Sequence, residues 1–352
     1  MIVRPLTEYC TLNMGQSPDS KTYNTQGKGL PFYQGNADFG ETHPITHVWC
    51  SAPVKVAEDG DILISVRAPI GAMNMAVERC CIGRGLAALT PIRNKCSKQF
   101  LYYALQSKVD SLIAQGTGST FKAISKKVLE ATCIPAYSTI EQEQIAEAIG
   151  HVDNTIAARR KQLALLDQLV KSRFIELFGD PIKNTQHRPT TAFVNVVTMQ
   201  RGFDLPVQDR EQSGNIPVYG SNGVLDHHNQ SKACNGGVIT GRSGTIGKVF
   251  YTRGAYWPLN TTLFSVDTHE NNIIYLAHLL RMFNLARFTE GTGVPTLNRN
   301  KFHSAPIIDV PIDEQNQFAA FVEQTDKSKF EIKQSLEKLE LLKKALMQKY
   351  FG

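Results

Sequence analysis

The sequence of 352 residues lacks the features that mark several large classes of protein. No apolar run approaches the roughly 18 residues that a membrane-spanning helix needs, and the chain does not open on a basic segment followed by an apolar one. We therefore expect neither a membrane span nor a signal peptide. The seven cysteines are odd in number and include no Cys-x-x-Cys pair, which argues against a disulfide framework or a zinc site. This pattern predicts reduced thiols and a cytoplasmic location.

Catalytic motifs are also missing from the sequence. The segment 241–248 resembles a phosphate-binding loop, but its glycines are one residue too far apart and Val249 replaces the Ser or Thr that would hold magnesium. Gly83-Arg84-Gly85 matches a loose dinucleotide-binding fingerprint, and a tight turn explains it better. There is no Gly-x-Ser-x-Gly motif, no His/Cys cluster at metal-ligand spacing, and no Asn/Asp-Pro-Pro-aromatic tetrapeptide of the amino-methyltransferases. We therefore predict no catalytic residue, no metal site and no cofactor bound to this chain.

The most regular feature that is present is an apolar seam from Glu141 to Phe178. Its residues repeat every 3.5 positions, which is typical of a coiled coil: Ile145, Ile149, Val152, Ile156, Leu163, Leu166, Val170 and Leu177. Gly179 and Pro181 follow as a stop signal. If it is helical throughout, this segment is ~57 Å long, comparable to about 17 base pairs of duplex. The pattern predicts one long spacer helix over 139–179.

The chain is internally duplicated. Glu141-Gln142 is matched 173 residues later by Glu314-Gln315, the same seam follows, and both segments end in Phe-Gly, at 178–179 and 351–352. The stretch 30–36 returns as 216–222, and Gly-Thr-Gly at 116–118 returns at 291–293. Such a repeat predicts two copies of one structural unit. We expect a globular domain over 1–138, the helix 139–179, a second globular domain over 180–310, and a second long helix over 311–352.

Basic and amide side chains recur on equivalent loops of the two globular parts. A solvated surface explains any one of them, and the net charge of +6 permits a polyanionic partner without requiring one. The glycines beside them let backbone approach a ligand closely. Lys and Arg neutralise phosphates, and Arg and Asn read guanine and adenine edges. We predict DNA contact by this set as a whole: Arg67, Arg84, Lys122, Lys126, Asn222, Arg242, Lys248, Asn298, Arg299 and Lys301.

The long helices also carry apolar residues beyond the seam. A narrow two-stranded seam would leave these side chains in water, so a broader stripe indicates a third element packed on the helices. Contact with a partner protein and contact with the chain's own globular parts are about equally favoured. The candidates for partner contact are Leu165, Leu169, Phe174, Phe178, Phe321, Leu342 and Phe351.

With these motifs, the sequence resembles the specificity subunits of Type I restriction-modification systems, and the resemblance covers nearly the whole chain. The most specific part is Ile216–Gly223 with Arg242-Ser243-Gly244-x-Ile246-Gly247-Lys248. The resemblance implies an α+β fold with two pseudo-twofold related target-recognition domains, separated by an antiparallel coiled coil of two long helices.

The resemblance also implies a function. Each recognition domain would read one half of a bipartite, asymmetric site on double-stranded DNA, while the helix pair sets the spacer and docks two modification subunits. Those subunits would bind S-adenosylmethionine and methylate adenine at N6, and separate motor-nuclease subunits would restrict DNA, so this chain would be no enzyme itself. Two alternatives stay open: the specificity subunit of a Type IIB-like restriction enzyme, and a duplicated protein-binding scaffold.

Overall fold

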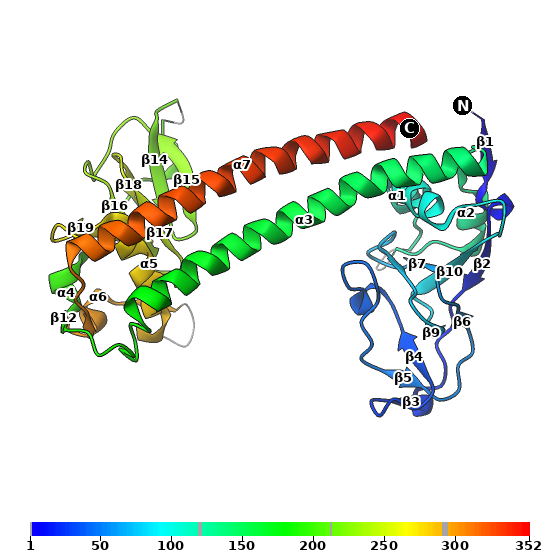
Figure 1. Ribbon diagram of the computed structural model, residues 1–352, viewed down its shortest axis with the longest axis horizontal. Helices are drawn as coiled ribbons and strands as arrows, with labels where there is room; N and C mark the ends of the chain where they lie inside the picture. The colour runs from blue at the N-terminus through cyan, green and yellow to red at the C-terminus, as the bar shows by residue number, and fades with distance from the viewer. Residues whose placement is uncertain (1, 119–121, 212, 291–294) are drawn as a thin grey trace. The chain divides into compact units, whose positions relative to one another are not determined.

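The computed structural model describes residues 2–118, 122–211, 213–290 and 295–352, which form two compact units (Figure 1). Unit 1 comprises Met1–Ala158 with Ser335–Gly352, and unit 2 comprises Arg159–Gln334. The long helices α3 (Thr139–Phe178) and α7 (Ile312–Phe351) each contribute to both units. Each unit thus contains a globular part and ends of both helices. The predicted division into two globular domains and two helices stays a prediction. The second Gly-Thr-Gly, at 291–293, lies outside the described residues.

Unit 1 is built on two small sheets. A four-stranded antiparallel sheet has the order β2 (Cys10–Met14), β10 (Leu86–Pro91), β7 (Ile62–Ser65) and β8 (Met73–Met75). A five-stranded mixed sheet has the order β3 (Tyr23–Asn24), β5 (Trp49–Cys50), β4 (Leu30–Tyr33), β9 (Cys80–Ile82) and β6 (Val56–Ala57). A third pair joins β1 (Val3–Pro5) to β11 (Cys133–Pro135).

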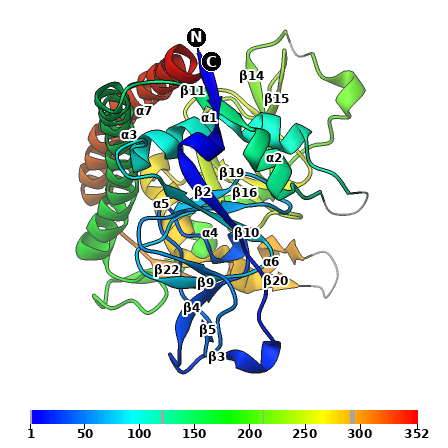
Figure 2. The same ribbon diagram turned by 90° about the vertical axis from the view of Figure 1, so that its right-hand side faces the viewer.

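Helices cover one end of unit 1. The main core lies between the four-stranded sheet, α1 (Lys98–Ala114), α2 (Lys126–Ala131), the start of α3 and the end of α7. Phe351 of α7 reaches Phe100 of α1 with a ring-centroid distance of 5.3 Å. Figures 1 and 2 both show β3, β4 and β5 at the end of the unit away from α1. The five-stranded sheet therefore extends away from the helix-covered core of the unit.

Unit 2 repeats this architecture. Its four-stranded antiparallel sheet has the order β13 (Thr198–Arg201), β19 (Thr262–Asp267), β16 (Gly237–Gly241) and β17 (Val249–Thr252). Beside it lie β15 (Gly223–His228), β14 (Ile216–Gly220) and β18 (Trp257–Pro258). Two further pairs are β12 (Thr190–Ala192) with β22 (Pro306–Ile308) and β20 (Thr289–Glu290) with β21 (Thr296–Leu297). The helices are α4 (Phe193–Val196), α5 (Ile273–Phe283) and α6 (Arg299–Phe302).

Matching hydrogen bonds identify equivalent positions in the two units. The amide of Ile124 donates to the Val66 carbonyl at 2.9 Å, and the amide of Leu297 donates to the Arg242 carbonyl at 2.7 Å. Because both acceptors directly follow the inner strands β7 and β16, Arg242 occupies in unit 2 the position of Val66 in unit 1. The duplicated sequence therefore folds into two copies of one frame with different side chains at equivalent positions.

A buried glutamine explains the repeated Glu-Gln at the start of each long helix. Gln142 accepts a hydrogen bond from the Ser97 amide at 2.9 Å, at the beginning of α1, and donates to the Tyr137 carbonyl at 3.0 Å. Gln315 makes the same two kinds of contact, with the Asn272 amide at 2.9 Å and the Val310 carbonyl at 2.7 Å. Buried amide groups need such partners. Each glutamine thus ties a long helix to the first turn of the shorter helix beside it.

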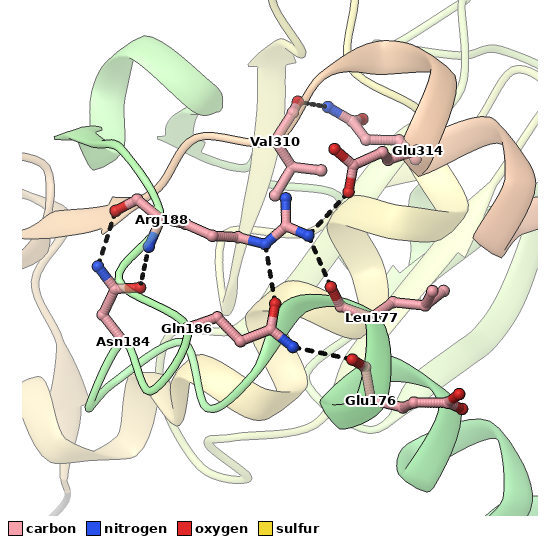
Figure 3. A network of polar contacts seen from close by, with 8 residues as sticks. Glu176, Leu177, Asn184, Gln186, Arg188, Val310 and Glu314 are labelled. Carbon is pink, nitrogen blue, oxygen red and sulfur yellow. Dashed lines mark hydrogen bonds and ion pairs between the residues drawn. The ribbon is translucent and has the colours of Figure 1, made fainter.

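In unit 2, one arginine joins the ends of both long helices (Figure 3). The Arg188 guanidinium donates to the Leu177 carbonyl in the last turn of α3 at 2.7 Å and to the Glu314 carboxylate in the first turn of α7 at 2.8 Å. Its loop is shaped by Asn184, which exchanges two hydrogen bonds with the Arg188 backbone. The unpaired carbonyls at a helix C-terminus favour a cation there. Arg188 therefore fixes where α3 ends relative to where α7 begins.

The predicted fold class is confirmed: two globular α+β parts are combined with two long helices. Within each unit the helix ends lie antiparallel, with Lys343 binding Asp153 at 2.7 Å in unit 1 and Lys329 binding Asp167 at 2.7 Å in unit 2. In the part of the chain that the structure describes, no helix has both the length and the apolar character needed to cross a membrane.

Candidate nucleic-acid interface

In unit 1, a pocket of about 310 Å³ opens where three loops meet. The turn after β4 supplies Gln34 and Asn36, the loop after β7 supplies Arg67, and the turn before β10 supplies Arg84. Arg67 and Arg84 come from separate motifs that the sequence singled out, and the fold brings them to one pocket. Both side chains are exposed and can reach a ligand.

Close backbone packing holds the loops of this pocket in place. The Gly85 amide donates to the Gln34 carbonyl at 3.2 Å. A Cβ at position 85 would lie 2.4 Å from the same oxygen, so only glycine allows this approach. The Ser65 hydroxyl donates to the Arg67 carbonyl at 2.9 Å, which fixes the loop after β7. The arginines therefore project from a rigid rim.

In unit 2, a pocket of about 330 Å³ opens between β13, the loop after β16 and the β21–α6 junction. It brings together three predicted residues, Arg242, Asn298 and Arg299. It also includes Arg201, the last residue of β13, which the sequence analysis did not select.

Backbone carbonyls orient two arginines of the unit 2 pocket. Arg242 Nη1 donates to the Asn260 carbonyl at 3.4 Å, and Arg299 Nη1 donates to the Met199 carbonyl at 3.4 Å. Asn298 caps the short helix α6 by accepting from the Asn300 amide at 3.1 Å. These long bonds leave each guanidinium with further donors for a ligand.

The remaining predicted DNA contacts do not line either pocket. Lys248 donates to the Asn222 side chain at 2.6 Å, at the tip of the β14–β15 hairpin. Lys301 pairs with Glu290 at 2.9 Å. In unit 1, Lys126 pairs with Glu130 at 3.3 Å, and Lys122 is exposed. DNA contact stays a prediction for all ten residues, and the lysines that are already paired keep further N–H donors for a ligand.

Three of the residues predicted for partner contact are unavailable to a partner. Phe174 and Phe178 pack with Phe318 in the core of unit 2, and Phe351 packs in the core of unit 1. For these three the prediction is wrong, because the shorter helices α1 and α5 supply the third element that the broad stripe requires. Phe321 is partly buried on the same core. The exposed members of the set are Leu165, Leu169 and Leu342, at 52%, 48% and 47% exposure.

A second, ionisable cluster in unit 2 lines a cavity of about 450 Å³ under the long helices. Lys329 binds Asp167 and reaches Asp326 at 3.4 Å. Beside them, burial lowers the pKa of His278 to about 3, helped by the positive charge of Arg281. Lys329 thus ties α7 to α3, and His278 of α5 packs on Phe318 of α7 with a ring-centroid distance of 5.3 Å. The described residues contain no group of three or more His, Cys, Asp or Glu side chains that could hold a metal ion.

Residues 1–168 and 195–343 match the family described as the Type I restriction modification DNA specificity domain. The chain belongs to this family. The two matched segments fall on the two copies of the duplicated frame, so the specificity domain occurs twice in the chain.

The relatives include two specificity subunits from Methanocaldococcus jannaschii. One, named as the type I restriction enzyme MjaX specificity subunit, is 41% identical over 164 residues, which cover 47% of this chain and 39% of the relative. The MjaIX specificity subunit is 28% identical over 185 residues, covering 49% of this chain and 43% of the relative. The matched segments thus span less than half the length of these relatives.

One solved structure matches over the full length of this specificity-domain chain. It is the S subunit of a Type I restriction-modification system from M. genitalium, with a TM-score of 0.68 at 16% identity, covering 100% of this chain and 96% of that one. At this identity the match establishes the shared fold.

Proposed function

We propose that this chain is the DNA-specificity subunit of a Type I restriction-modification complex and performs no catalysis itself. Each unit would read one half of a bipartite, asymmetric DNA site. The observation that carries the proposal is that each unit has an arginine-lined pocket beside the loop that follows its inner strand, β7 or β16. Arg fits this task because it can bind phosphates and can read guanine bidentately.

The long helices have a separate role in this proposal. They act as the spacer that sets the unread gap between half-sites, and their exposed leucines contribute to the surface on which two methyltransferase subunits dock. S-adenosylmethionine and N6-adenine methylation belong to those subunits, and motor-nuclease subunits complete the complex. A protein with two similar readers meets two half-sites on one duplex, as dimeric DNA-binding proteins do.

A gel-shift titration with the methyltransferase partner tests this function. We expect a DNA complex whose affinity falls steeply with salt, because neutralising several phosphates releases counterions. Binding that is indifferent to salt would favour the protein-binding scaffold instead. Methyl transfer by the purified chain without any partner would overturn the non-catalytic role.

Arginine substitutions test the assignment of the pockets. Arg242→Ala or Arg299→Ala should weaken recognition of one half-site by about 1–3 kcal/mol if the lost contact is bidentate to a base. The measurement is the methylation rate at limiting enzyme on duplexes with single base changes. A rate and base preference equal to those of the wild-type chain would refute the assignment.

A further inference from the structure

The arginines of the two pockets occupy different positions of the shared frame. Directly after the inner strand, unit 1 has Val66 and Arg67, whereas unit 2 has Arg242 and Ser243 at the equivalent positions. Arginine therefore stands at the first position in one unit and at the second in the other. Arg67 lines the unit 1 pocket with Arg84, whereas Arg242 lines the unit 2 pocket with Arg201 and Arg299, so the arginine after the inner strand meets different neighbours in the two units.

Arg201 extends this difference to another strand. The amide of Gly202, which follows Arg201, donates to the backbone carbonyl of the first residue of β19 at 3.1 Å. In the same way, the amide of Gly15, which follows Met14, donates to the backbone carbonyl of the first residue of β10 at 2.9 Å. Arg201 thus holds the position of Met14, so unit 1 carries no charge there. The duplication conceals Arg201, because its repeat partner is apolar.

The unit 2 pocket has an excess of positive charge. Arg201, Arg242 and Arg299 line it with one carboxylate, Glu290, and that carboxylate is paired with Lys301 at 2.9 Å. Like charges in a shared pocket repel one another, and an electron-rich ligand relieves that repulsion.

Arg201 is free to meet such a ligand. Its side chain is exposed, and it makes no hydrogen bond or ion pair with any other residue in the ranges that the structure describes. Arg242 and Arg299 are each held by a backbone carbonyl. The three guanidinium groups therefore combine two oriented donors with one that can adjust.

We propose that Arg201 is a further DNA-contacting residue of unit 2, which completes with Arg242 and Arg299 a site for an electron-rich acceptor of DNA. The acceptor is either the O6/N7 edge of a guanine or a backbone phosphate, both of which accept two hydrogen bonds from one guanidinium. This inference rests on the proposed function. It implies that the half-site read by unit 2 includes a contact that unit 1 cannot make.

The test replaces Arg201 by the residue that unit 1 uses. The full chain with its methyltransferase partner first selects a preferred duplex from a pool with randomised positions. Arg201→Met should then weaken binding to that duplex by about 5- to 100-fold. Lys183→Met removes the same charge from an exposed loop of unit 2 outside the pocket and should bind like the wild-type chain. Arg201→Met should unfold at the wild-type temperature, because the side chain is exposed.

Two readouts distinguish the sources of the acceptor. A phosphate contact predicts that Arg201→Met weakens all duplexes equally and lowers the salt slope by about 1, and that Arg201→Lys restores most of the affinity. A guanine contact predicts a loss confined to one base pair, which Arg201→Lys does not restore, because lysine lacks the bidentate fork.

Either pattern supports the site. Affinity and base preference of Arg201→Met equal to those of Lys183→Met would overturn it while leaving the proposed function intact. A wild-type chain that selects no duplex and binds without salt dependence would overturn the proposed function, and this inference with it.

Discussion

The Arg188 side chain bridges the two long helices in unit 2. It binds the end of α3 and the start of α7, and its guanidinium stacks over the Phe178 ring at 5.4 Å. The Arg188 side chain is only 19% exposed. Charge-assisted hydrogen bonds from such a half-buried group contribute more to stability than exposed surface ion pairs do. Arg188→Ala should lower the free energy of unfolding by about 2–3 kcal/mol, and Arg188→Lys should recover only part of it because lysine lacks the fork.

Urea unfolding of the full chain measures this effect. In a Trp49→Phe background, the fluorescence of Trp257 reports unit 2 alone, since these are the two tryptophans of the chain. Arg253→Ala is the matched control. Arg253, like Arg188, pairs with a glutamate of α7, in this case Glu323, but its side chain is 64% exposed. If Arg188→Ala cost no more than this control, the joining role of Arg188 would be wrong.

His278 should make unit 2 sensitive to acid. Burial, Arg281 and Lys329 lower its pKa from 6.5 to about 3, so the folded state keeps it neutral while the unfolded chain takes up a proton below about pH 6.5. The unfolded state then binds more protons, and stability falls as the pH drops from 6.5 towards 3. His278→Gln should flatten this dependence, measured as urea midpoints at several pH values. Burial also lowers the pKa of His303, so His303→Gln is measured as a separate variant to separate its contribution from that of His278. An unchanged pH profile in His278→Gln would contradict the assignment.

At the residue scale the sequence pointed to five of the residues that line the two candidate pockets. Arg67, Arg84, Arg242 and Arg299 stand beside glycines or in repeated loops, and these signals survive in a single sequence. Arg201 has no such signal, because Met14 is its counterpart in the other unit. The pairing of Lys301 with Glu290 could not be predicted, because only the folded chain brings this carboxylate near. Lys126 and Glu130 lie four residues apart on α2, so their pairing follows from helical spacing.

At the scale of elements, the long helices were predictable and the short strands were not. A seam repeating over 38 residues defines a helix whatever surrounds it, and α3 and α7 are 40 residues each. Strands of two residues, such as β3, β5 and β6, are too short to show an alternation of apolar and polar residues. They form only because neighbouring strands pair with them. Phe174 and Phe178 were misassigned for the same reason, because periodicity does not reveal that α5 packs on them.

The proposed role of the helices as a spacer leads to a prediction at this scale. Inserting one heptad into both α3 and α7 adds about 10 Å to each helix, which corresponds to about 3 base pairs. The preferred gap between the two half-sites should widen by that amount in sequencing of methylated DNA. A variant in which the same heptad replaces seven residues without lengthening the helices should keep the original gap. Retention of that gap by the lengthened protein would show that the helices are not the ruler.

At the scale of the whole molecule, the duplication was evident from the sequence, but the composition of the two units was not. The repeat offset marks where each copy begins, whereas the assignment of helix ends to units depends on packing such as that of Phe351 on Phe100. The frame is shared and the arginine positions differ. Under the proposed function, one fold used twice would read two unlike half-sites.

Single-molecule sequencing of adenine methylation, in cells that carry this chain with its methyltransferase partner, tests the central claim most directly. We predict one bipartite motif with two specific halves and an unread gap, and Arg242→Ala should relax base preference in one half alone. A continuous motif, or a loss of preference in both halves at once, would contradict the account.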